Sequence, residues 1–162
     1  MDQLWSPWRM EYIREAKQDP DAGCVFCTLL TDGLEGQPGP LFVGELAWVT
    51  LAKYPYNPGH LLVLPVRHEG ELDTLTDEEA DAISRLLRRS VAVLREASEP
   101  HGFNVGLNLG RAAGAGIPDH LHWHVIPRWG GDSNFMPVVG HTRVLPELLA
   151  ETYGRLKPRF DA

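Results

Sequence analysis

The sequence predicts an α+β domain in which helices pack on an antiparallel sheet. Two observations predict this class: short apolar runs typical of strands occur in pairs, and one long amphipathic helix separates the two pairs. No apolar run is long enough to cross a membrane, and no signal-peptide-like stretch opens the chain. We therefore expect a single cytoplasmic domain over residues 1–162, with an arm at about 1–22, a core at about 23–140 and a C-terminal helix at about 145–157.

The first strand pair is expected at residues 47–51 and 61–65, which are short apolar runs. The segment between them, 53–59, contains prolines and a glycine that exclude regular structure, so the two strands are expected to pair antiparallel. The stretch 31–40 before them is rich in glycine and proline and is interpreted as a loop.

The clearest helix is predicted over residues 76–97. Thr76 and Glu79 have the spacing of a capping box, the apolar residues that follow lie on one face, and Pro100 ends the helix. Two further strands are predicted after it, at 103–109 and 121–127, with a final helix at about 145–156.

The charge of the chain limits its partners. The 162 residues are 43% hydrophobic and 23% charged, as in an ordinary soluble domain, and the formal net charge is −7 with neutral histidines. This balance favours no general attraction to nucleic acid or to an anionic membrane. A phosphate-bearing ligand would therefore need a dedicated local site.

The strongest functional signal is a row of three histidines, His120, His122 and His124, which alternate with apolar residues. Side chains of a strand alternate between its two faces, so we expect the three imidazoles to share one face. Burying such a row without partners costs free energy, and a purely structural explanation is therefore disfavoured.

Two functional interpretations of this row are open. In the first, two or three of the histidines bind one metal ion. In the second, a neutral imidazole, with an ordinary pKa of about 6.5, attacks phosphorus and forms a phosphoramidate. We favour the second, because the glycine-rich loop 110–116 leads into the histidines and could offer backbone N–H groups to phosphate oxygens. Asn108 could donate to a phosphate oxygen, although such a loop and a lone asparagine are also typical of ordinary turns.

The two cysteines, Cys24 and Cys27, form one Cys-x-x-Cys motif. A redox pair is the least favoured explanation, because no βαβ unit is predicted around it. Two buried thiols or half of a zinc site remain, and a zinc site of this kind would need two imidazoles to complete it.

The histidine row gives the chain its resemblance to the histidine-triad superfamily. The signature of that superfamily is His-φ-His-φ-His-φ-φ, with φ apolar, and residues 120–126 read His-Leu-His-Trp-His-Val-Ile. The resemblance continues through 54–65, 102–108 and 127–132, and it covers most of residues 40–140. It implies a five-stranded antiparallel sheet with packed helices, a homodimer and an enzyme acting on nucleotides. Together with LWSPWRMEYI near the start, these segments resemble the bacterial branch that acts on dinucleoside polyphosphates such as diadenosine tetraphosphate.

The resemblance also implies roles for individual residues. His122 would be the nucleophile, His124 would contact the scissile phosphate or leaving-group oxygen and help as proton donor, and His60 would orient the triad. A buried histidine satisfied by backbone carbonyls is the alternative for His60. The residues expected to hold substrate phosphates are Asn108 and the backbone of Ala115, Gly116 and Ile117.

A zinc-bearing branch of the superfamily looks similar at Cys-x-x-Cys and at a histidine just past the strand at 61–65. This resemblance implies that one structural zinc is bound by Cys24, Cys27, His68 and His120. Such a zinc would fasten the histidine row beside His122 without taking part in bond breaking. The resemblance also allows Mg²⁺ carried by the polyphosphate substrate.

Three other functions compete with this one. They are a nucleoside phosphoramidate hydrolase, a nucleotide-binding module without turnover, and a metallohydrolase with catalytic zinc on all three histidines. Hydrolysis and phosphorolysis differ only in the second acceptor, and the sequence does not decide between water and phosphate.

Overall fold

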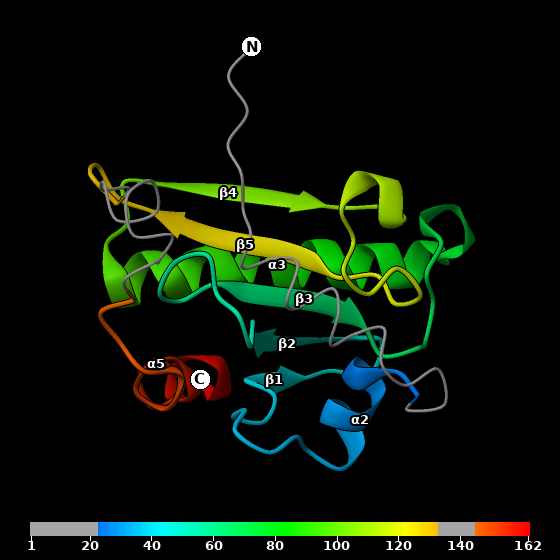
Figure 1. The fold of residues 1–162 in the computed structure, drawn as a ribbon, viewed down its shortest axis with the longest axis horizontal. Helices are drawn as coiled ribbons and strands as arrows, with labels where there is room; N and C mark the ends of the chain where they lie inside the picture. Colours follow the sequence, from blue (N-terminus) through cyan, green and yellow to red (C-terminus); the bar gives the residue numbers. More distant parts are fainter. Residues whose placement is uncertain (1–22, 133–144) are drawn as a thin grey trace.

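The computed structural model describes residues 23–132 and 145–162, and its strands form one antiparallel sheet of five strands in the order β1-β2-β3-β5-β4 (Figure 1). The strands are β1 (Phe42–Val43), β2 (Ala47–Leu51), β3 (Leu61–Pro65), β4 (Gly102–Leu107) and β5 (Trp123–Arg128). The helices of the described residues are α2 (Val25–Thr31), α3 (Asp77–Ser98) and α5 (Leu149–Asp161), with short 3-10 turns η1 (Leu72–Thr74) and η2 (Arg111–Ala113). The predicted α+β class and the five-stranded sheet are confirmed. The predicted arm at 1–22 and the end of the predicted core lie outside the described residues.

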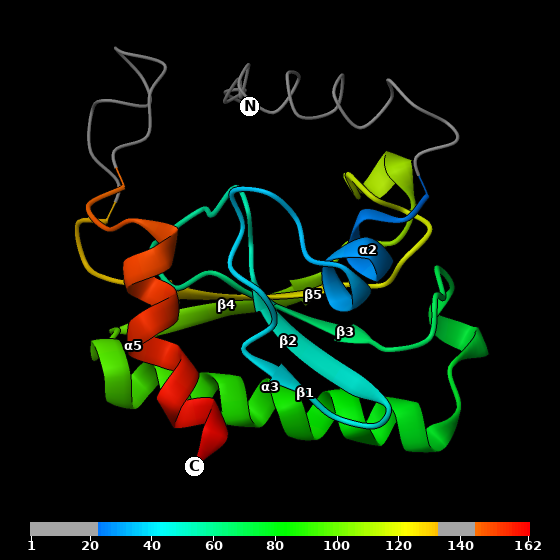
Figure 2. The ribbon, with the colours of Figure 1, turned by 90° about the horizontal axis from the view of Figure 1, so that it is seen from below.

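Both faces of the sheet are covered at β2 and β3, because every residue of these two strands is buried. Alternate side chains of the two strands enter two different cores. The larger core lies against α3 and α5, and the smaller one lies beneath α2 on the opposite face (Figure 2). The smaller core consists of Phe26, Leu29, Trp48, Ala52, Leu62 and Leu64.

The helix α3 follows the prediction to within one residue at each end. The Thr76 hydroxyl accepts from the Glu79 N–H at 3.2 Å, and the Thr76 N–H donates to the Glu79 carboxylate at 2.9 Å, so both halves of the capping box are formed. At the other end Glu99 adopts a left-handed conformation with φ of 44°, directly before Pro100.

The histidine row lies mostly outside its predicted strand. β5 begins at Trp123 rather than at Leu121, because pairing to β3 and to β4 begins there on both sides. The residues before Trp123 run instead beside the chain that follows β3, where the Leu121 N–H donates to the Glu69 carbonyl at 2.7 Å. Of the three histidines, only His124 belongs to the strand.

Other element boundaries also differ, and β4 occupies Gly102–Leu107 where a strand at 103–109 was predicted. The final helix, predicted over 145–156, occupies Leu149–Asp161 as α5, and it buries Thr152, Leu156 and Phe160 against the rest of the molecule. The helix α2 was not predicted, because it has seven residues and its N-cap, Cys24, makes no side-chain capping bond. No helix within the described residues is long and apolar enough to cross a membrane.

Candidate active site and metal centre

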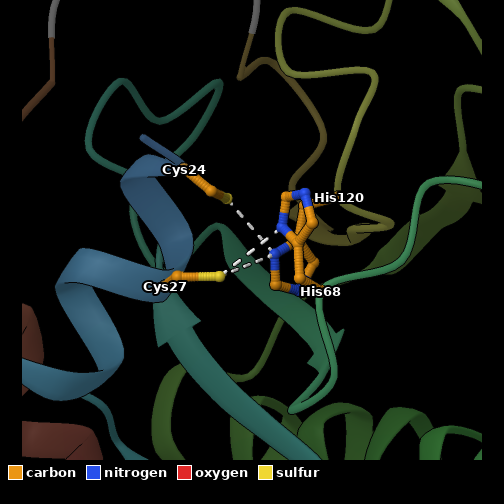
Figure 3. Close-up of side chains that lie close together, drawn as sticks. All are labelled: Cys24, Cys27, His68 and His120. Atoms are coloured by element: carbon orange, nitrogen blue, oxygen red, sulfur yellow. Dashed lines mark hydrogen bonds between the residues drawn. The ribbon is translucent and has the colours of Figure 1, made fainter. Parts of the chain in front are cut away.

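Two cysteines and two histidines from three parts of the chain gather at one end of the sheet (Figure 3). Cys24 and Cys27 come from the start of α2, His68 follows β3, and His120 begins the histidine row. One candidate ligand atom from each of them lies within 4.8 Å of all the others. The four predicted zinc ligands are therefore brought together.

The distances within this cluster fit a tetrahedral zinc ion. Nδ1 of His120 lies 3.3 Å from Sγ of Cys24 and 3.7 Å from Sγ of Cys27. Nδ1 of His68 lies 3.5 Å from Sγ of Cys27. Tetrahedral bonds of about 2.3 Å to sulfur and about 2.05 Å to nitrogen place these ligands about 3.5 Å apart.

The protonation states of the cluster also suit a cation. Nε2 of His120 lies 3.0 Å from the Pro65 carbonyl oxygen, which can only accept, so the ring proton is on Nε2 and the lone pair on Nδ1 faces the thiols. Burial lowers the pKa of His120, which favours this neutral form. Burial and the neighbouring Cys24 raise the pKa of the Cys27 thiol to about 11, so two thiolates here require a nearby positive charge.

His122 is held with its other nitrogen available for reaction. Its Nδ1 lies 2.8 Å from the backbone carbonyl oxygen of His120, so the proton is on Nδ1 and Nε2 carries a lone pair. The side chain is buried beside the ring of Phe26, whose centroid is 5.1 Å away. Burial lowers the pKa of His122, which keeps the imidazole neutral and nucleophilic at neutral pH.

His124 lies next to both the nucleophile candidate and His60. Its ring centroid is 5.2 Å from that of His122, and its Nδ1 is 2.9 Å from Nε2 of His60. His60 is 2% exposed, and its Nδ1 accepts from the Tyr56 N–H at 3.1 Å. The structure thus brings the three predicted catalytic histidines together and gives each a different partner.

A cavity of about 390 Å³ opens beside His124. Its lining residues are Tyr56, Asn104, Val105, Gly106, Leu107, Asn108, Ala113, His124 and Ile126. Asn108, predicted to bind phosphate, shares this cavity with His124. A ligand in the cavity would therefore contact both side chains.

Part of the predicted phosphate-binding loop forms an internal backbone hydrogen bond. The Ala115 N–H donates to the Gly110 carbonyl at 3.2 Å, and the Ala115 side chain is buried. Ile117 packs against the smaller core. In this conformation the Ala115 N–H is engaged within the loop, and phosphate binding by Gly116 and Ile117 stays a prediction.

Sequence reasoning assigned no role to three residues that build the site. Tyr56 stacks on His60 with ring centroids 5.0 Å apart, and it also lines the cavity. Asn57 and Asp132 are joined by a 2.7 Å hydrogen bond from Nδ2 to Oδ2 across 75 residues of sequence. An aromatic residue only four positions before His60 could have pointed to Tyr56. The contact between Asn57 and Asp132 joins distant segments, and no local sequence pattern predicts it.

The HIT domain family model matches residues 41–131, which span β1 to the end of β5 and include the three histidines. The chain therefore belongs to the HIT domain family, and it is a nucleotide-processing enzyme of that family.

Relatives with assigned activities share most of this chain. An AP-4-A phosphorylase of Mycobacterium tuberculosis is 43% identical over 157 residues, covering 94% of this chain and 80% of that protein. An adenosine 5'-monophosphoramidase of Schizosaccharomyces pombe is 30% identical, covering 65% of this chain and 74% of that protein. Among solved structures, a Zn-bound histidine triad family protein from Mycobacterium smegmatis superimposes with a TM-score of 0.69 at 26% identity, over 86% of this chain and 94% of that one.

Proposed function

We propose that the enzyme cleaves dinucleoside polyphosphates of the diadenosine tetraphosphate type at an α-phosphate, through a covalent nucleotidyl-His122 intermediate. The observation that carries the proposal is the hydrogen bond from His122 Nδ1 to the His120 carbonyl, because it leaves Nε2 with a free lone pair next to His124. The 43% identical AP-4-A phosphorylase supports the substrate class.

The reaction has two in-line displacements at phosphorus. In the first, Nε2 of His122 attacks the α-phosphorus while the polyphosphate departs, and the His120 carbonyl stabilises the positive charge of the imidazolium. His124 contacts the departing oxygen, and Asn108 holds a phosphate oxygen from the same cavity. In the second displacement, an acceptor attacks the same phosphorus and His122 is released.

Rapid-quench labelling with α-³²P diadenosine tetraphosphate tests the intermediate. We expect acid-labile label on His122 in the wild-type protein and none in His122→Ala. A useful control is His101→Gln, because His101 is an exposed turn residue outside the site. Absence of label from the wild type, or its retention in His122→Ala, would contradict the mechanism.

A phosphoramidate substrate is the second candidate, favoured by the 30% identical monophosphoramidase. Kinetics on diadenosine tetraphosphate and adenosine phosphoramidate, measured side by side, separate the two. We expect kcat/KM to favour the dinucleotide by more than about a hundredfold, equivalent to about 2.7 kcal/mol. The opposite preference would assign the chain to the amine-releasing class.

We propose in addition that Cys24, Cys27, His68 and His120 bind one structural zinc. The ligand distances and the Zn-bound relative support this site. When bound, the zinc would supply a fixed anchor for His120, and thus for the carbonyl that contacts His122.

Metal analysis of purified variants tests the site. Cys24→Ser should lose zinc, whereas His101→Gln should retain it, because His101 lies outside the cluster. A catalytic zinc on all three triad histidines would instead survive Cys24→Ser. Retention of zinc in that variant would therefore reject the structural site.

A homodimer completes the proposal, on the basis of the family resemblance. Gel filtration at several protein concentrations is expected to give the dimer mass throughout. A monomer mass at the highest concentration would contradict it.

A further inference from the structure

The cavity beside His124 extends away from the nucleophile candidate His122. His124 and Ile126 are alternate residues of β5, so their side chains share one face of the strand and lie about 7 Å apart. Both line the cavity, whereas His122, which precedes the strand, does not. The cavity therefore extends beyond His124 toward Ile126.

The neighbouring strand β4 supplies the other side of this hollow. Gly106 pairs directly with His124. Asn104 pairs directly with Ile126. Directly paired residues of an antiparallel ladder point to the same face, and all four residues line the cavity together with the ring of Tyr56. We call the part of the cavity lined by these five residues the trough.

Gly106 has no structural explanation within β4. The pairing of the strand is continuous from Gly102 to Leu107, so Gly106 does not form a bulge, and its φ is not positive. A Cβ built on Gly106 would meet no atom of the described residues within 4 Å, so no other segment requires its small size. Glycine inside a strand costs stability, and the remaining reason for it is the close approach of a ligand.

The other groups of the trough suit a nucleoside. Oδ1 of Asn104 accepts from Arg128 at 2.8 Å, which leaves the amide N–H groups of Asn104 to donate to a ligand. The Tyr56 ring stacks on His60 with centroids 5.0 Å apart, and its remaining surface borders the trough opposite the apolar side chain of Ile126. An aromatic ring, an apolar side chain and an amide donor are groups that hold a base and its ribose. None of the residues that line the trough is acidic, so phosphates are not repelled.

We propose that the trough binds the departing half of the dinucleotide, a nucleoside polyphosphate, and that Gly106 is the specificity-determining residue that gives this half room. The inference rests on the proposed function and deepens it, because it assigns the departing half of the substrate to a defined part of the site. With diadenosine tetraphosphate, the departing half is ATP. A substrate with a small leaving group would not occupy the trough.

The stereochemistry of an in-line displacement supports this assignment. Nε2 of His122 forms the bond to the α-phosphorus on one side, and the bond from phosphorus to the bridging oxygen breaks on the opposite side, with its electron pair on the departing ATP. In the proposed mechanism His124 contacts that oxygen, so the rest of the departing half continues past His124 into the trough. The whole cavity, at about 390 Å³, has the size of a small-ligand site.

Gly106→Val tests the proposal with two substrates that share the adenylyl group and differ in the leaving group. Valine suits a strand, and its side chain would fill the trough beside His124. We expect kcat/KM for diadenosine tetraphosphate to fall at least about tenfold, a usual effect of one altered pocket contact. The value for adenosine phosphoramidate, which releases only ammonia, should stay the same. Equal losses on both substrates, or no loss on either, would overturn the proposal.

Gly102→Val is the matched control. Gly102 belongs to the same strand and the same face as Gly106, and a Cβ built on it also meets nothing within 4 Å. It does not line the cavity, so valine there should leave kcat/KM unaltered on both substrates. A loss on the dinucleotide equal to that of Gly106→Val would reject the assignment, because it would come from valine in β4 rather than from a blocked trough.

Binding to His122→Ala gives a readout that does not depend on turnover. The dinucleotide stays intact in this background, and AMP reports the half that is retained. By calorimetry, adding Gly106→Val should raise the Kd for diadenosine tetraphosphate at least about tenfold and leave that for AMP unchanged. An equal loss of affinity for AMP would place the retained half in the trough and contradict the proposal. This comparison decides the question even if the wild type does not turn over the phosphoramidate.

Asn104→Asp tests the trough by charge instead of volume. Aspartate has the shape of asparagine and can keep the bond to Arg128, but it adds a negative charge beside the departing phosphates. We expect a loss of kcat/KM on diadenosine tetraphosphate alone, and a smaller loss at higher salt, because salt screens the repulsion. A loss that is shared by the phosphoramidate, or is independent of salt, would count against the proposal. This variant decides if Gly106→Val does not fold.

The two proposals fail in different ways. Absence of labelled His122 from the wild type contradicts the proposed function. Labelled His122 that forms from diadenosine tetraphosphate as fast in Gly106→Val as in the wild type contradicts only the inference about the trough.

Discussion

The carbonyl oxygen of Pro65 is a single acceptor with two buried donors. Nε1 of Trp48 lies 3.1 Å from it, and Nε2 of His120 lies 3.0 Å from it. Trp48 is fully buried in the smaller core, so its indole fixes the position of the carbonyl that orients His120. One core residue thereby supports the proposed metal centre through one backbone atom.

Replacing Trp48 by phenylalanine removes one of these bonds and leaves space in a closed core. We expect Trp48→Phe to lower the free energy of unfolding by about 1–3 kcal/mol. Urea unfolding measures the change. Trp129→Phe is the matched control, because Trp129 also donates to a carbonyl, that of Ser98 at 3.2 Å, but is only half-buried. Equal losses in the two variants would contradict the assigned role of Trp48.

Asp132 links stability to pH. The Arg128 guanidinium, assisted by the Asn57 side chain and the Trp129 N–H, holds the pKa of Asp132 well below its usual range, against the opposing effect of burial. The folded-state pKa therefore lies below the unfolded value of about 3.9. Ionised Asp132 stabilises the fold above that pH, and its contribution declines as the pH falls through this window toward the folded-state pKa.

Asp132→Asn should therefore be less stable than the wild type at neutral pH, and the difference should narrow as the pH falls below about 4. Urea unfolding of both proteins over this range gives the measurement. Asp81→Asn, at a side chain that is 76% exposed, should show no such trend. A difference that is constant with pH would reject the ionic contribution of Asp132.

The chemistry of the histidine row was predictable from residue type and spacing, but the three separate roles were not derivable from the residues alone. Each role depends on the partner of one ring nitrogen: the Pro65 carbonyl for His120, the His120 carbonyl for His122, and His60 for His124. Two of these three partners are more than fifty residues distant in sequence. No local pattern encodes such contacts, and the family resemblance anticipated only the orienting role of His60.

At the level of elements, α3 is joined to the chain beyond β3 by its own capping residue. Glu79 closes the capping box with Thr76, and the same carboxylate accepts from Arg67 at 2.8 and 2.9 Å. Arg67 directly precedes His68, one of the proposed zinc ligands. The start of α3 and the proposed metal centre are thus connected through one ion pair.

Two substitutions separate the cap from the ion pair. Glu79→Gln can keep the capping box, since glutamine serves there as well, whereas Glu79→Ala loses it. We expect Glu79→Ala to be less stable than Glu79→Gln by about 1 kcal/mol, the usual worth of a cap. Thermal or urea unfolding provides the comparison. Equal stability of the two variants would contradict the capping role.

The elements differ in how well the sequence predicts them. α3 was located closely, because Thr76, Glu79 and Pro100 mark its ends and its apolar face has a clear period. α2 was missed because seven residues carry too little pattern. β5 begins where Trp123 pairs with Val63 of β3 and Leu107 of β4. The alternation of histidines and apolar residues begins earlier, at His120, so it does not mark the first residue of the strand.

For the whole molecule, the proposed metal centre joins segments that are far apart in sequence. Cys24 and His120 are separated by 96 residues, and their ligand atoms are 3.3 Å apart. A zinc ion bound only by the folded chain stabilises it by mass action, by about 4 kcal/mol at a thousandfold excess over its Kd.

Removal of zinc should accordingly lower the melting temperature of the wild-type protein, because that contribution is lost. Scanning calorimetry with and without a chelator measures the shift, and Cys24→Ser supplies the control, since its melting temperature should not respond to the chelator. Identical wild-type melting curves under both conditions would exclude a stabilising zinc.

The order of the strands is also a whole-molecule property. The α+β class follows from the sequence of apolar runs, but the position of β5 between β3 and β4 requires long-range pairing that no run of residues displays. The resemblance supplied the strand number, and the pairing itself comes from the structure.

The two faces of the sheet differ in the elements that pack on them. The larger core, against α3 and α5, lies on one face, whereas the smaller core, α2 and the cysteines of the proposed zinc site lie on the other. In β5 the cavity residue His124 points away from the larger core, which its neighbour Val125 enters. Substitutions at cavity residues on the face of His124 should therefore have little effect on the packing beneath α3. Such a separation gives the chain room to evolve, or to be engineered toward, new nucleotide substrates while its folding stability is preserved.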